Sequence, residues 1–231
     1  MKSILLEISL DSLESAIAAE RGGTHRVELC DNLAEGGTTP SRKTIELVRK
    51  KITIGLQVMI HPHGGDFCYS DPEFDTMKKD IADAKQLGAD GVVFGILKKD
   101  RTVDKERTKI LVDLAKPMST TFHRAFDIAS DPLRSLEEII SAGCDRLLTS
   151  GQRRTAEEGI PLIAKLIKHA GDRIIIIPGC GINSLNVKNI LDKTGATEIH
   201  IGTAATSRVG SHHIVDEQKV KMLMQIISGR R

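Results

Sequence analysis

The chain has 231 residues, of which 40% are hydrophobic, and its 33 Lys and Arg nearly balance its 31 Asp and Glu. This length suits one α/β barrel domain with a sizeable core, and the balanced charge argues against a nucleic-acid or anionic-membrane surface. No uncharged apolar segment approaches the roughly 20 residues of a membrane helix, and Met1-Lys2-Ser3 leads into a strand-like run without a signal-peptide pattern. We therefore expect a cytoplasmic protein whose partner is a small molecule, a metal ion or another protein.

Strand-like apolar runs recur at a regular pitch, and each is followed by a stretch of helical periodicity. The eight runs are Ile4 to Leu10, His25 to Cys30, Thr53 to Ile60, Asp90 to Leu97, Met118 to Ala125, Cys144 to Ser150, Arg173 to Pro178 and Glu198 to Thr203. Eight β-then-α units predict a single-domain (β/α)8 TIM-type barrel over residues 1–231. Its core would span about residues 4–205, and residues 206–231 would form a tail with a final helix from Ile214 to Ile227.

A doubly wound sheet is the alternative fold. It would require a glycine-rich turn, and Gly179-Cys180-Gly181 has no third glycine in register.

Side chains on barrel strands alternate between the interior and the helix layer. Leu6 and Ile8 suit the helix layer, so their polar neighbours should face inward. The same alternation predicts an inward set of Glu7, Ser9, Glu28, Cys30, Gln57, Met59, His61, Thr121, His123 and His200. Because barrels place function at the carboxyl ends of their strands, these groups should converge at one mouth.

Two long loops follow the second and third strands, at residues 31–40 and 61–70, and both contain glycine. They are candidate lids on the same rim. The second loop begins with His61 and His63, two imidazoles that cannot share a helix face, followed by glycines that allow close backbone approach. This loop is expected to contact a ligand.

Glu7 and Glu28 lie on adjacent strands and could form a carboxylate pair in which one pKa rises, giving an acid and a base. The alternative is a structural salt bridge to Arg26 or another interior cation. His123 ends the fifth strand, where barrels keep working residues, and adds a group that titrates near neutral pH.

Cys30 and Met59, on neighbouring strands with His61 or His123 nearby, offer the soft ligands that suit copper(I). Buried Cys and Met are also common core residues. The four cysteines form no C-x-x-C motif, so neither a zinc knuckle nor a disulfide framework is indicated.

Gly179 and Gly181 follow the seventh strand, and Gly202 follows the eighth. Phosphate-binding barrels present backbone N–H groups at these two loops. Glycine is equally common as loop punctuation.

Several motifs in order resemble the CutC family. They are Glu-Leu-Cys at 28–30, Glu-Gly-Gly-Thr-Thr-Pro-Ser at 35–41, Gly-Gly-Asp-Phe-Cys-Tyr-Ser at 64–70, Thr-Phe-His-Arg-Ala-Phe-Asp at 121–127 and Leu-Thr-Ser-Gly at 148–151. The resemblance covers the chain to about residue 205. It implies a TIM-type barrel, a cytoplasmic homo-oligomer (dimer or tetramer) and a role in copper homeostasis, without a defined reaction.

Two positions depart from the family pattern. His61 and His63 stand where members usually carry arginines, so permanent cations become groups that titrate near pH ~6.5 when unperturbed. Ser9 stands where many members carry a cysteine, so a two-thiolate copper site with Cys30 is not available. If the two histidines hold an anion, binding should weaken above pH ~6.5; if they hold a metal, it should weaken as the pH falls.

Three hypotheses follow. The first is copper(I) binding at the barrel mouth through Cys30, assisted by Met59 or His61. The second is an enzyme acting on a small anionic or phosphorylated substrate, with Glu7, Glu28 and His123 in acid–base roles. Its substrate contacts would come from His61, His63, Asp66, Arg124, Asp127, Ser150, Gly179, Gly181 and Gly202. The third is an oligomeric scaffold.

Overall fold

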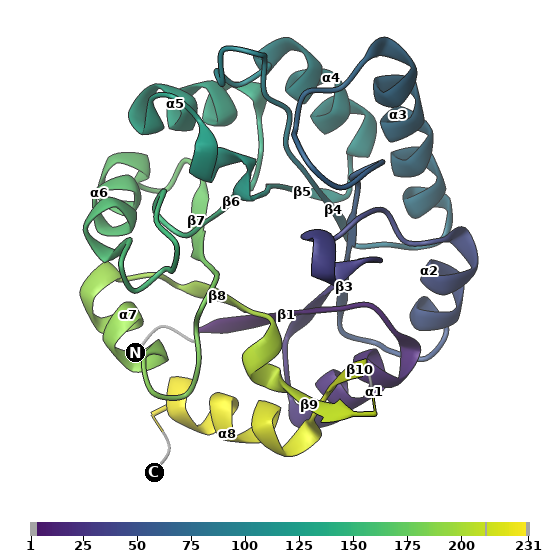
Figure 1. The fold of residues 1–231 in the computed structure, drawn as a ribbon, viewed down its shortest axis with the longest axis vertical. Coiled ribbons are helices and arrows are strands. Elements are labelled where there is room, and N and C mark those ends of the chain that lie inside the picture. Colours follow the sequence, from purple (N-terminus) through teal and green to yellow (C-terminus); the bar gives the residue numbers. More distant parts are fainter. Residues whose placement is uncertain (1–3, 211, 230–231) are drawn as a thin grey trace.

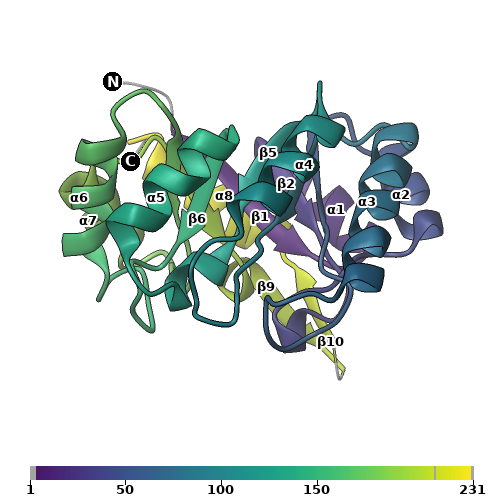
Figure 2. The ribbon, with the colours of Figure 1, turned by 90° about the horizontal axis from the view of Figure 1, so that it is seen from above.

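The structure, a computed structural model, describes residues 4–210 and 212–229. Eight parallel strands form the inner wall of a barrel, with helices outside it (Figures 1 and 2). The strands are β1 (Leu5–Leu10), β2 (Arg26–Leu29), β3 (Gly55–Met59), β4 (Gly91–Phe94), β5 (Ser119–Phe122), β6 (Arg146–Thr149), β7 (Ile175–Pro178) and β8 (Glu198–Ile201). The predicted single-domain TIM-type barrel is confirmed, and the doubly wound alternative is wrong because β1 pairs with both β2 and β8.

The helices cover the outer face of the strands. They are α1 (Leu13–Gly22), α2 (Arg42–Arg49), α3 (Asp71–Gln86), α4 (Lys105–Ala115), α5 (Pro132–Ala142), α6 (Ile160–Ala170), α7 (Val187–Thr194) and α8 (Glu217–Ile227). Short polar side chains cap the amino ends of several helices. At α1, Ser12 accepts a hydrogen bond from the Ser15 amide, and at α5, Asp131 accepts from the Leu133 and Arg134 amides. Such local caps fix where each helix begins.

Short segments at the strand ends complete the rim. They are the 3-10 turns η1 (Leu33–Glu35), η2 (Arg124–Ile128) and η3 (Thr203–Ala205), and the antiparallel pair β9 (Thr206–Val209) and β10 (His212–Val215). This pair corrects the predicted tail. Ile214 and Val215 belong to β10, and the last helix begins at Glu217 because the Asp216 side chain accepts from the Gln218 and Lys219 amides. The end of the predicted tail, residues 230–231, lies outside the described residues.

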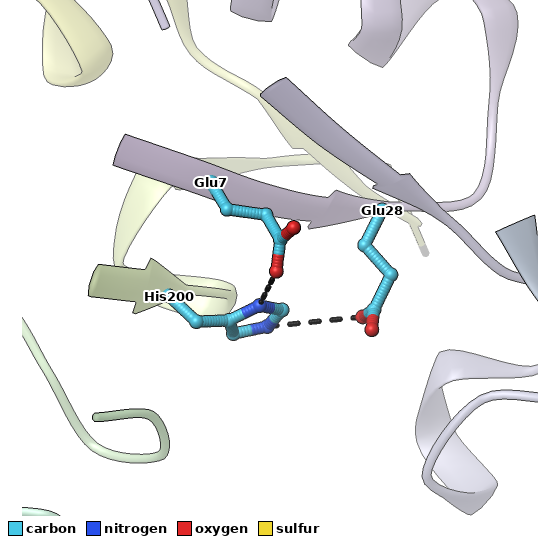
Figure 3. Close-up of side chains that lie close together, drawn as sticks. All are labelled: Glu7, Glu28 and His200. Atoms are coloured by element: carbon cyan, nitrogen blue, oxygen red, sulfur yellow. Dashed lines mark hydrogen bonds and ion pairs between the residues drawn. The ribbon is translucent and has the colours of Figure 1, made fainter. Parts of the chain in front are cut away.

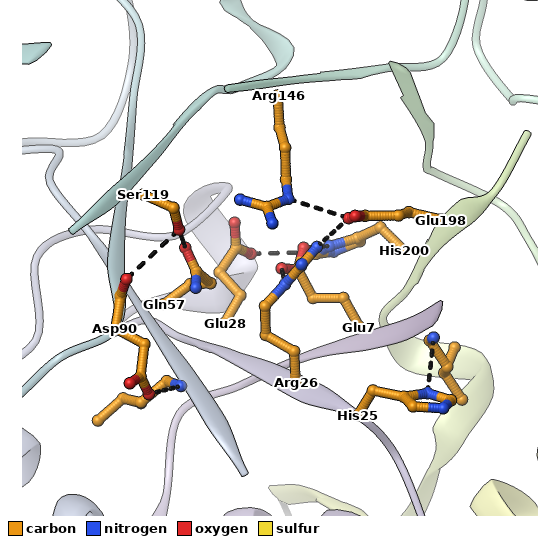
Figure 4. A network of polar contacts seen from close by, with 12 residues as sticks. Glu7, His25, Arg26, Glu28, Gln57, Asp90, Ser119, Arg146, Glu198 and His200 are labelled. Atoms are coloured by element: carbon orange, nitrogen blue, oxygen red, sulfur yellow. Dashed lines mark hydrogen bonds and ion pairs between the residues drawn. The ribbon is translucent and has the colours of Figure 1, made fainter. Parts of the chain in front are cut away.

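Alternation along the strands gives the barrel a polar interior. Leu6 and Ile8 are fully buried on the helix side, whereas Glu7 lies inside. At the amino ends of β2, β6 and β8, Arg26 and Arg146 bind one Glu198 oxygen at 2.7 and 3.0 Å (Figure 4). This ion network fills the bottom of the barrel and leaves the carboxyl ends of the strands for a site.

Candidate functional site

A cavity of about 590 Å³ opens at the carboxyl ends of the strands. It is bounded by strand residues and by the loops after β2, β3, β7 and β8. Its lining includes Ser9, Glu28, Met59, His61, Phe67, His123, Arg124 and His200. Six of the ten side chains predicted to face inward therefore share this space, whereas Glu7, Cys30, Gln57 and Thr121 do not line it.

Three side chains lie close together at the cavity floor: His200 and Glu28 line the cavity, and Glu7 contacts His200 from beneath it (Figure 3). The Nδ1 of His200 lies 2.8 Å from Oε1 of Glu7, and its Nε2 lies 3.8 Å from Oε2 of Glu28. The other Glu7 oxygen is 2.5 Å from Nε of Arg26. Glu7 thus belongs to the structural salt bridge that the sequence left open as an alternative, and it also orients His200.

Burial and charge separate the two carboxyl groups. Burial raises the pKa of Glu28. Although burial also acts to raise the pKa of Glu7, Arg26 and His200 hold it at about 2. Burial would lower the pKa of His200, but the Glu28 and Glu7 carboxylates together raise it. Burial and charge thus act on Glu28 and His200 in a way that favours protonation of both groups, whereas Glu7 stays ionised.

His200 is the site residue to which the sequence assigned no role. Its inward position on β8 was predicted, but only the pairing of β8 with β1 brings it beside Glu7. Aligning the first and last strands in register could have predicted the contact, because Glu7 is paired directly with His200.

Ligand atoms of Glu7, Glu28 and His200 lie within 4.8 Å of one another, as in many metal sites. Both Glu7 oxygens are already engaged, one by Arg26 and one by His200. Only Glu28 and Nε2 of His200 would be left for an ion. The three fit a proton-sharing chain better than a metal centre.

The proposed copper ligands lie at one edge of this floor. Met59 lines the cavity, but Cys30 is 1% exposed and packs behind it with Val93. The thiol donates to Oε2 of Glu28 at 3.6 Å, and burial together with Glu28 raises the pKa of Cys30 well above its ordinary value. The two sulfur atoms suit copper(I), but the thiol must lose its proton to bind it.

His61 and His123 lie side by side in the cavity wall, with ring centroids 5.8 Å apart, and Phe67 packs against both. Burial lowers the pKa of His61, and burial together with His61 lowers the pKa of His123 to about 3. Both rings are therefore neutral at physiological pH. The expectation that His123 titrates near neutrality is wrong, because the ring is desolvated.

His63 and Asp66 lie away from the cavity. The His63 ring is 38% exposed and contacts Glu73 at 3.2 Å, and the exposed Asp66 accepts from the Cys68 amide at 3.0 Å. Neither is among the residues that line the cavity. Both shape the loop after β3.

Arg124, Asp127 and Ser150 join two loops of the rim. Arg124 lines the cavity and donates to Asp127 at 2.8 Å, while Asp127 accepts from the amide and the hydroxyl of Ser150. Asp127 and Ser150 thus support Arg124 without lining the cavity themselves.

Gly181 and Gly202 line the cavity, but Gly179 does not. At Gly179 a Cβ would lie 2.6 Å from a Leu148 methyl carbon, so this glycine permits close packing of β7 on β6. Arg124 is the one permanently charged cation among the described residues that line the cavity. Two acidic residues, Glu28 and Glu35, also line it. An anion would find little fixed positive charge here.

A sequence model of the CutC family matches residues 4–205. The chain belongs to the CutC family. It is 48% identical over 206 residues to the human copper homeostasis protein cutC homolog, covering 89% of this chain and 76% of the relative. A CutC family protein from Chromobacterium violaceum is 50% identical over 196 residues, covering 85% of this chain and 79% of the relative.

Solved structures agree with this assignment. The CutC structure from Streptococcus agalactiae superposes with a TM-score of 0.80 at 35% identity, covering 86% of this chain and 98% of that one. A phosphoribosylanthranilate isomerase from Thermotoga maritima superposes with a TM-score of 0.65 at 13% identity, covering 98% of this chain and 99% of that one, and shows the barrel fold alone. In the described part of this CutC family chain, no helix is long and apolar enough to cross a bilayer.

Proposed function

We propose that this CutC family protein works in copper homeostasis, the role in its relatives' names, and that its barrel mouth binds a small molecule and transfers a proton on it. The observation that carries the second part is Glu28. Its carboxyl group is 3% exposed, lies in the cavity wall, and has one oxygen, Oε1, without a hydrogen-bond partner. A buried, unpartnered carboxyl oxygen is costly unless a ligand satisfies it.

Each member of the floor then has one task. Glu28 holds the proton that moves, since burial raises its pKa and so favours the protonated form. Nε2 of His200, 3.8 Å from the Glu28 carboxyl group, exchanges a proton with the bound molecule, while Glu7 holds the ring through Nδ1 and Arg26 holds Glu7. His123 is neutral and serves as a polar contact, not as the base.

The test uses Glu28→Gln, which keeps the side-chain volume and removes the proton. Metabolite mixtures are screened by thermal shift against the wild-type protein, and each stabilising compound is followed for conversion by mass spectrometry. We expect Glu28→Gln to bind the compound and convert it at least ~100-fold more slowly. The matched control is Glu46→Gln on the exposed face of α2. Equal conversion by Glu28→Gln and wild type would refute the acid–base role.

Copper(I) binding is the second candidate, because Cys30 and Met59 form their own buried cluster and Nε2 of His61 has no partner. We expect Cys30→Ala to lose at least ~10-fold in copper(I) affinity in an anaerobic competition titration. Cys68→Ala is the control, because Cys68 lies on the loop after β3 and its thiol donates to the Leu97 carbonyl beyond β4. The same affinity for Cys30→Ala and wild type would exclude this site.

A further inference from the structure

The cavity wall also presents two imidazole nitrogens that have no hydrogen-bond partner among the described residues. His61 and His123 are 3% and 4% exposed, both line the cavity, and Nε2 of each ring has no hydrogen-bond partner. Buried polar atoms are normally paired, so these two await a ligand group or water. Which kind of group they accept depends on where each ring carries its proton.

Backbone contacts assign opposite protonation to the two rings. Nδ1 of His61 lies 2.7 Å from the Gly37 carbonyl oxygen, which can only accept, so Nδ1 carries the proton and Nε2 is a bare acceptor. Nδ1 of His123 accepts from the Ala125 amide at 3.2 Å, so its proton is on Nε2, which is a donor. One wall therefore shows an acceptor and a donor side by side.

Local packing holds the donor in place. A Cβ at Gly95 would lie 2.5 Å from Nδ1 of His123, so only glycine leaves room for this ring position. On the other side, the His61 amide donates to Oγ1 of Thr39 at 2.9 Å, and the Thr39 amide donates to the His61 carbonyl at 3.0 Å. Both rings are thus fixed before a ligand arrives.

We propose that His61 and His123 together recognise a neutral amide, whose N–H donates to His61 and whose C=O accepts from His123. This rests on the proposed function, in which the mouth binds a small molecule, and names the substrate class. An amide carries its donor and acceptor on separate atoms, which suits two rings with centroids 5.8 Å apart. A carboxylate offers no donor to His61, and an amidinium offers no acceptor to His123, so each leaves one buried nitrogen unpaired.

The first test reads the rings directly. Long-range ¹H–¹⁵N spectra of the full ¹⁵N-labelled chain at pH 7 should show His61 protonated at Nδ1 and His123 protonated at Nε2. The same tautomer at both positions, or a charged ring at either, overturns the proposal.

The second test compares three isosteric probes: benzamide, benzoate and benzamidine. Benzamide should shift both Nε2 resonances and bind at least ~10-fold more tightly than the other two. His61→Arg replaces the acceptor with a cationic donor and should reverse the order in favour of benzoate. His123→Phe should abolish the benzamide preference, and His169→Gln, on the surface of α6, should keep it. Far-UV circular dichroism checks the fold of each variant.

Benzoate binding as tightly as benzamide to wild type, or an unchanged order in His61→Arg, would overturn the proposal. These readouts involve no turnover and no change at Glu28. Their failure would leave the acid–base role of Glu28 standing, whereas failure of the Glu28→Gln test would leave the amide preference standing.

Discussion

At the scale of single residues, Glu7 and Glu28 point into the barrel from neighbouring strands but have different environments, because Glu7 is in register with Arg26 and Glu28 with Ser9. Glu7 has Arg26 at 2.5 Å and His200 at 2.8 Å, whereas Glu28 has the Cys30 thiol at 3.6 Å and His200 at 3.8 Å. Close, charged partners favour ionisation, and burial without them opposes it. One carboxyl group is therefore structural and the other is available for chemistry.

The first prediction concerns Glu7. Its pKa falls from the ordinary 4.5 to about 2 on folding, so its contribution to stability is present above pH 4.5 and is lost as the pH falls toward 2. We expect Glu7→Gln to lower the free energy of unfolding by about 3 kcal/mol at pH 7. Urea unfolding at several pH values measures this.

The same titration contains its control. The wild-type stability loss between pH 4.5 and 2 should shrink in Glu7→Gln and remain in Glu46→Gln, whose carboxylate is exposed on α2. An undiminished acid loss in Glu7→Gln would show that other carboxylates cause it.

At the scale of elements, Asp127 joins η2 to the loop after β6. Its side-chain oxygens accept from the Thr149 hydroxyl, the Ser150 amide and the Gln152 amide at 2.5, 3.0 and 3.2 Å. The side chain is 7% exposed, so these bonds are shielded from water. This one carboxylate fixes the rim on which Arg124 stands.

The second prediction is that Asp127→Asn lowers the free energy of unfolding by about 2 kcal/mol, because the amide loses a negative charge and places an N–H where donors converge. Asp131→Asn is the matched control, since asparagine caps the α5 N-terminus about as well as aspartate. Thermal unfolding of both variants measures the difference. Equal melting temperatures of Asp127→Asn and Asp131→Asn would mean that the Asp127 carboxylate is not needed to hold the rim.

At the scale of the whole molecule, the barrel has a seam. Register pairs join seven neighbouring pairs of strands among the described residues, from β8 through β1 and on to β7. No register pair joins β7 to β8 within residues 4–210, although the two are neighbours in Figure 1. Pro178, which has no amide to donate, ends β7.

The third prediction follows from this seam. Backbone amides of β7 and β8 that face each other should exchange with deuterium faster than those of β1 and β2, which are paired on both sides. Native-state hydrogen exchange with mass spectrometry compares them in one sample. Equal protection of the two pairs of strands would indicate a fully closed barrel.

The sequence predicted the fold, the family and the inward set because these depend on local patterns. Alternation with a period of two assigned Glu7, Glu28, His123 and His200 to the interior without any knowledge of their neighbours. The helix prediction was wrong at Ile214 and Val215, because apolar residues suit a helix and a strand equally well. The strand β10 is stabilised by contacts far along the chain, such as the hydrogen bond from the Val215 amide to the Ser15 hydroxyl.

Which side chains enter the barrel can be predicted from the strand pattern, because side-chain direction along a strand is a local property. Which of them meet depends on the folded barrel. Pairing of β8 with β1 brings His200 to Glu7, and the Gly37 carbonyl and Ala125 amide fix the protons of His61 and His123. Partners, pKa values and tautomers depend on distances between residues far apart in the chain, which no local pattern specifies.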